Sequence, residues 1–92
     1  MVVEFGTPHL GACQILAPVL ESVSSVFSGQ VRIAKLDVDS NPKTSRSYGI
    51  QSLPVLLIFK QGRVVDHITG VVSKQVLTDK LNALLVAETP DK

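Results

Sequence analysis

The feature that most constrains this fold is a long helical periodicity set between two β-prone runs. Apolar residues recur at three- and four-residue spacing after Cys13, which is typical of an amphipathic helix. They are Ile15, Leu16, Val19, Leu20, Val23, Val26 and Phe27. Gly29 favours a helix end near Ser28. The flanking runs 1–5 and 31–37 have strand character, and a helix of this length between them predicts a parallel strand pair with a right-handed crossover.

Two further β-prone runs, 55–60 and 63–69, are separated only by Gln61 and Gly62. This spacing predicts an antiparallel hairpin with a tight turn. Combined with the parallel pair, the hairpin predicts an α/β fold with a four-stranded mixed sheet.

Two shorter helix signals complete the pattern. Ser40 or Asn41 is expected to cap a short helix that has Pro42 in its first turn and ends at about Tyr48. Ser73 is expected to cap a last helix with one apolar face. The residues of that face are Val76, Leu77, Leu81, Leu84 and Leu85. We therefore expect three helices on the two faces of the sheet, one domain over residues 1–87 and a polar tail over residues 88–92.

Composition narrows the function classes. A net charge of +1 with 18% charged residues gives no electrostatic footprint for nucleic acid. The longest apolar run, Leu53–Phe59, is too short to cross a bilayer, and the first residues lack the features of a signal peptide. The single cysteine cannot form an internal disulfide, so we expect a reducing compartment and a cytoplasmic protein. That cysteine with His9 and His67 does not supply the usual ligands of a metal site, and no cofactor is expected.

Several short motifs occur in a fixed order along the chain. They are Phe5 with Pro8, Gly11 with Cys13, Ala17-Pro18, Ala34 to Asp39, Tyr48 to Ile50, Leu53-Pro54, and Leu57 to Gly62 with Gly70. In this order they resemble the thioredoxin family from Val2 to about Leu85, including its F-W-A-P-W-C-G-P-C-K segment. The resemblance implies the thioredoxin fold, a cis peptide bond before Pro54 and a role in thiol–disulfide exchange and redox homeostasis.

The departures from this resemblance lie at the chemical centre. Gly6 and His9 replace the two tryptophans of the family pattern, Leu10 replaces the first cysteine and Ala12 the proline, while Glu4 stands where thioredoxins have a buried aspartate. In a dithiol reductase the first cysteine attacks the substrate disulfide and the second resolves the mixed disulfide. With Leu10 in place of the nucleophile, we expect at most a weak monothiol oxidoreductase.

The resemblance also assigns candidate roles around the remaining cysteine. Cys13 is the candidate reactive thiol, with Glu4 and Lys35 as the candidate proton-transfer pair beneath it. Two plainer interpretations stay open: Cys13 as a small buried apolar residue, and Glu4 reaching solvent on its longer side chain. His9 is either a base near Cys13 or a solvated loop residue.

Two functions from different classes therefore compete. The favoured one is a peptide- or protein-binding module, either a holdase chaperone or an assembly factor, and the alternative is thiol–disulfide exchange through Cys13 alone. The partners would be proteins or peptides with cysteines or with apolar extended segments. The candidate substrate-binding residues are Gly6, His9, Leu10, Gly11, Leu53, Pro54 and Gly70.

The resemblance further implies a strand and a helix before the segment that matches Val2 to Phe5, and neither precedes it here. Without them the strand at 31–37 has an open edge. Open strand edges invite pairing between chains. We expect either a homodimer through this edge or marginal stability.

Overall fold

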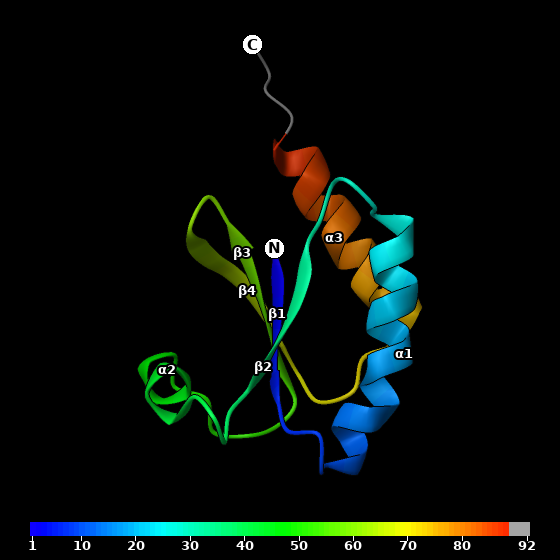
Figure 1. Ribbon diagram of the computed structural model, residues 1–92. Helices are drawn as coiled ribbons and strands as arrows, with labels where there is room; N and C mark the ends of the chain where they lie inside the picture. Colours follow the sequence, from blue (N-terminus) through cyan, green and yellow to red (C-terminus); the bar gives the residue numbers. More distant parts are fainter. Residues whose placement is uncertain (89–92) are drawn as a thin grey trace.

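The computed structural model describes residues 1–88 (Figure 1). Its elements follow in the order β1 (Val2–Gly6), α1 (Gly11–Val26), β2 (Ile33–Asp37), α2 (Pro42–Ser47), β3 (Val55–Lys60), β4 (Arg63–Thr69) and α3 (Lys74–Glu88). This order confirms the predicted α/β class and its three helices. Glu88, expected as the first tail residue, is the last residue of α3, and the expected tail at 89–92 lies outside the described residues.

The four strands form one mixed sheet in the order β2-β1-β3-β4. β1 pairs in parallel with β2, from Val2 opposite Ile33 to Gly6 opposite Asp37. It pairs antiparallel with β3, and β3 and β4 form the predicted hairpin. β1 therefore has a strand on each side, while β2 lies at one edge of the described sheet, as expected.

Helices α1 and α3 cover one face of the sheet, and α2 lies on the other (Figure 1). Because side chains alternate along a strand, Val2 and Glu4 face α1, whereas Val3 and Phe5 face the opposite way. Burying one large apolar side chain stabilises a fold by roughly 1.5–3 kcal/mol, so the layer beneath α1 and α3 is the main source of stability. Its buried members are Val2, Leu16, Leu20, Val23, Phe27, Leu56, Ile58, Val72, Leu77 and Leu81.

The second face carries a smaller core around Phe5, Val55 and Leu57. Because α2 is only six residues long, Tyr48 beyond its end supplies part of the cover. The Tyr48 ring meets the rings of Phe5 and Phe59 edge to face, with centroids 5.8 Å apart in each pair. Tyr48 is itself 44% exposed, so this face is less deeply covered than the other.

The predicted apolar face of α1 is too wide. The helix begins two residues before Cys13 and ends at Val26, and two residues assigned to its face are exposed, Ile15 by 62% and Val26 by 53%. Spacings of three and four residues keep side chains on one line of a helix, whereas adjacent positions diverge by about 100°. Ile15 therefore points away from the sheet. The buried stripe is Cys13, Leu16, Leu20 and Val23.

At the start of α3, too, one of two adjacent apolar residues is exposed and the other is buried. Val76, predicted on the apolar face, is 48% exposed, unlike the buried Leu77. Ser73 caps α3 as predicted, because its Oγ accepts the backbone N–H of Val76 at 3.1 Å. Asn41 is the cap residue of α2, but its side chain does not cap the helix; Nδ2 instead donates to the carbonyl oxygen of Asp37 at 2.9 Å.

Candidate functional site

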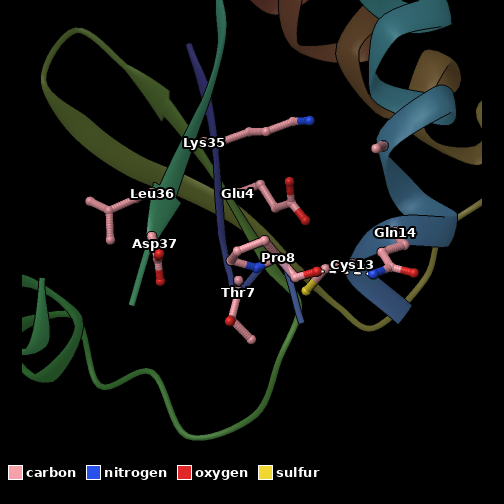
Figure 2. A pocket seen from close by; sticks show the side chains of 10 residues that line it. Glu4, Thr7, Pro8, Cys13, Gln14, Lys35, Leu36 and Asp37 are labelled. Atoms are coloured by element: carbon pink, nitrogen blue, oxygen red, sulfur yellow. Dashed lines mark hydrogen bonds between the residues drawn. The ribbon is translucent and has the colours of Figure 1, made fainter. Parts of the chain in front are cut away.

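A cavity of about 290 Å³ opens where β1 and β2 end and α1 begins (Figure 2). Both strands run in parallel, so their carboxyl ends meet at the same edge of the sheet. The polar groups that line the cavity are Glu4, Thr7, Cys13, Gln14, Lys35 and Asp37. Several polar and charged side chains therefore gather at one end of the apolar interface between helix and sheet, around a cavity whose surface is mostly apolar.

The loop between β1 and α1 is held by hydrogen bonds to α1 and to the segment that follows β2. Gln14 Nε2 donates to the carbonyl oxygen of Pro8 at 3.0 Å, and Thr7 Oγ1 donates to Asp39 Oδ2 at 3.3 Å. Leu10 is the N-cap residue of α1, and its apolar side chain makes no capping hydrogen bond. Its carbonyl oxygen accepts the N–H of Cys13 at 3.1 Å, which begins the helix.

Cys13 lies in the first turn of α1, and its side chain is only 7% exposed. The sulfur packs directly over the backbone of Gly6. A Cβ atom added to Gly6 would lie 2.6 Å from Cys13 Sγ, closer than real Cβ atoms approach such a neighbour. The absence of a side chain at Gly6 is therefore what gives the sulfur its place, a dependence that the sequence does not reveal.

Glu4 is the least expected group in the site. Its side chain is 4% exposed, so the interpretation that it reaches solvent is wrong. Within residues 1–88 its carboxylate makes no hydrogen bond and no ion pair shorter than 4.0 Å. Burial raises the pKa of the Glu4 carboxyl above its ordinary value of 4.5, and the positive charge of Lys35 offsets part of that rise.

The predicted proton-transfer pair is adjacent but not bonded. Glu4 and Lys35 are partners in the parallel register of β1 and β2, and both line the cavity. Figure 2 shows the Glu4 carboxylate directed from β1 toward α1, on the same side as the Cys13 sulfur. A Gly6 Cβ would lie 3.3 Å from Glu4 Oε2 as well as close to the sulfur, so both atoms surround one point.

The remaining predicted residues fall outside this cavity. His9, Leu10 and Gly11 are exposed and do not line it, and Leu10 is 36% exposed. The Leu53-Pro54 peptide bond is cis, as the resemblance implied.

Pro54 and Gly70 are joined by a backbone hydrogen bond. The Pro54 ring is less than 2% exposed, and the carbonyl oxygen of Pro54 accepts the N–H of Gly70 at 2.8 Å. The Pro54 ring is therefore closed to a ligand in this structure. Leu53 is half-buried, and its backbone makes no hydrogen bond within the described part of the chain.

Sequence reasoning missed three polar lining residues, Thr7, Gln14 and Asp37, and three apolar ones, Pro8, Ala17 and Leu36. Asp37 carries a signal that could have been used, because it ends a strand paired in parallel with β1 and so lies at the same sheet edge. Gln14 carries none, since a polar residue in a first helical turn is ordinary.

The described residues hold no group of three or more His, Cys, Asp or Glu side chains placed to bind a metal ion. None of the helices, as far as they are described, is long and apolar enough to cross a membrane.

Comparison with known proteins gives one consistent result. The family model described as "Thioredoxin" matches residues 1–83. A thioredoxin of Synechocystis is 41% identical over 85 residues, which cover 92% of this chain and 79% of that protein. Thioredoxin 2 of Chlorobaculum tepidum is 42% identical over 81 residues, covering 88% of this chain and 74% of that protein. A Staphylococcus aureus thioredoxin is 40% identical over 81 residues, covering 88% and 78% respectively.

Proposed function

This chain belongs to the thioredoxin family, and from that premise we propose that it is a single-thiol member, exchanging Cys13 with disulfides small enough to enter the cavity. The observation that supports this most directly is the position of Cys13 on the wall of an opening cavity, opposite a buried carboxyl and a lysine. A cysteine that served only as core packing would need neither the opening nor the two charged neighbours.

Dithiol chemistry has no second thiol in this sequence. Leu10 occupies the N-cap position of α1, one helical turn before Cys13, and the chain has one cysteine in all. A mixed disulfide on Cys13 therefore has no internal thiol to resolve it. An external thiol must complete each cycle, which suits a reducing compartment such as the cytoplasm.

Glu4 is the proposed proton acceptor for this exchange. The thiolate is the nucleophile in thiol–disulfide exchange, so the proton on Cys13 must leave before attack. Glu4 lies within the same small space as the sulfur and has no competing hydrogen-bond partner in residues 1–88. Lys35 then acts by its positive charge, which favours the ionised form of Glu4.

Two assays test the reactivity of Cys13 and the competence of the thioredoxin scaffold separately. Purified protein is incubated with 2-hydroxyethyl disulfide, and mixed-disulfide formation is followed by mass spectrometry, with Cys13→Ala as control. In parallel, insulin reduction by dithiothreitol is measured for wild type and for Leu10→Cys, which restores a cysteine pair. We expect adduct on Cys13, little insulin reduction by wild type and a clear gain in Leu10→Cys. No adduct on the folded chain would refute the proposal.

Peptide binding is a second candidate, and the exposure of Leu10 with the unpaired backbone of Leu53 favours it. An extended segment could add its main chain to Leu53 and lay an apolar side chain on Leu10. If the chain is a holdase, the Cys13→Ala variant should suppress heat-induced aggregation of a client enzyme as well as the wild type does. The Leu10→Gln variant should suppress it less well. Suppression that requires Cys13 would instead assign the effect to thiol chemistry.

A further inference from the structure

The cavity around Cys13 is small and lies between the ends of β1 and β2 and the first turns of α1. Its volume of about 290 Å³ lies at the low end of small-molecule sites. An occupant of amino-acid size fits such a space, whereas a folded protein or a peptide segment does not enter it. The volume of the cavity therefore favours a low-molecular-weight ligand at the sulfur.

Glu4 adds a chemical requirement to this size limit. A buried carboxylate without a partner is unfavourable, and a cation with N–H donors relieves that cost. Glu4 is 4% exposed and makes no hydrogen bond or ion pair within the described residues, and its carboxylate is directed into the cavity (Figure 2). The site thus presents an acceptor that no group of residues 1–88 uses.

The charged side chains that line the cavity also favour a cationic ligand. Glu4 and Asp37 contribute two carboxyl groups, and Lys35 is the single cationic side chain among the lining residues. Lys35 is exposed at the far side of Glu4 from Cys13 in Figure 2. A ligand that enters toward the sulfur meets more negative than positive charge, which favours an ammonium group over a carboxylate.

We propose that this cavity takes the amine-bearing half of a small aminothiol disulfide, with its sulfur against Cys13 and its ammonium group against Glu4. The inference rests on the proposed single-thiol exchange and specifies its substrate class. Glu4 Oε2 and Cys13 Sγ both surround the position of a Gly6 Cβ, at 3.3 and 2.6 Å from it. A ligand with only two carbon atoms between its sulfur and its amine suits two groups that lie this close to one point.

The reaction is one thiol–disulfide exchange. The Cys13 sulfur attacks one sulfur of the ligand, the S–S bond of the ligand breaks, and a new S–S bond joins Cys13 to the aminothiol. Cys13 is oxidised, and the departing half of the ligand is reduced to a thiol. The Cys13 proton passes by way of one carboxyl oxygen of Glu4 to the departing thiol, while the other oxygen accepts a hydrogen bond from the ammonium group, so no further oxidant or reductant takes part.

The experiment compares three disulfides that differ in charge: cystamine, 2-hydroxyethyl disulfide and 3,3′-dithiodipropionate. Rates of adduct formation on Cys13 are measured by mass spectrometry on the folded chain and on the same chain unfolded in urea. The unfolded chain supplies the intrinsic reactivity of each reagent. Glu4→Gln removes the acceptor charge, and Glu21→Gln, an exposed residue farther along α1, is the matched control.

We expect the folded chain to prefer cystamine over 2-hydroxyethyl disulfide by about tenfold more than the unfolded chain does, as one charge-assisted hydrogen bond supplies. Glu4→Gln should lose this extra preference, and Glu21→Gln should keep it. Adduct formation without an extra preference, or an equal preference in Glu4→Gln, overturns the aminothiol assignment while leaving single-thiol exchange intact. Reaction of the folded chain with none of the three overturns both.

Discussion

At the two ends of the contact between α1 and the sheet, side chains face the interior with the same spacing, but one end is packed core and the other holds the cavity. Val2 and Glu4 lie two residues apart on the same face of β1, and Leu16 and Cys13 lie three residues apart on the same stripe of α1. Near Val2 the space is filled by apolar side chains, whereas near Glu4 it holds a cavity with a thiol and an unpaired carboxyl. Facing the interior therefore does not by itself distinguish a core position from a site position.

Truncation in the apolar end should have the largest effect. Leu20→Ala removes a side chain that is 1% exposed and should lower the free energy of unfolding by about 2–5 kcal/mol. Ile15→Ala, on the solvent side of the same helix, should change it by less than about 0.5 kcal/mol. Urea denaturation of both variants measures this. Similar losses would mean that α1 is rotated relative to the arrangement described.

The close contact at the polar end can be tested by adding one methyl group. Gly6→Ala places a Cβ against Cys13 Sγ and should cost about 1–3 kcal/mol of stability through overpacking. In a Cys13→Ala background the sulfur is gone, and the same change should cost less. A double-mutant cycle by chemical denaturation gives the coupling energy. A coupling energy near zero would contradict the packing of the sulfur over Gly6.

The pH dependence of stability should differ between wild type and Glu4→Gln. The folded-state pKa of Glu4 is raised above 4.5 by burial, so the folded protein holds its proton after the unfolded chain has lost it. Wild type should therefore lose stability as pH rises through that interval, and the loss should level off above the folded-state pKa. Glu4→Gln should lack this decline, which denaturation at a series of pH values reports. A parallel decline in the variant would assign it to another group.

The smallest stability effect is expected at a surface ion pair between α3 and β4. Lys80 Nζ lies 3.1 Å from Asp66 Oδ2, with both side chains more than 30% exposed. Lys80→Ala should lower the free energy of unfolding by less than about 1 kcal/mol. The cost should fall further at high salt, because exposed charges are screened. A salt-independent loss would point to packing of the lysine stem instead.

The open edge of β2 remains a proposal that concerns association. β2 lies at the edge of the described sheet, and an edge strand can pair with a second copy. Gel filtration over a wide concentration range should show a shift toward a dimer. If the protein elutes as a monomer at every concentration and is also highly stable, then neither the expected dimer nor the expected marginal stability follows from this edge.

Much of the fold could be predicted because it depends on local patterns. The period of the apolar residues, the Gln61-Gly62 turn and the cap at Ser73 each act over a few neighbouring residues, and each occurs in the structure. The exposure of Ile15 and Val76 could not be obtained in this way. An apolar residue beside a buried stripe is compatible with either orientation until the packing of the helix on the sheet is known.

The same division applies to the site. The sequence by itself determined that one thiol is present, that leucine stands at the position of the family's first cysteine, and that a glutamate lies within a strand. Only the tertiary structure decided that Cys13 Sγ and Glu4 Oε2 meet over Gly6 in one cavity. That meeting depends on the rotation of α1 about its axis and on its distance from β1, which contacts across the whole interface determine together.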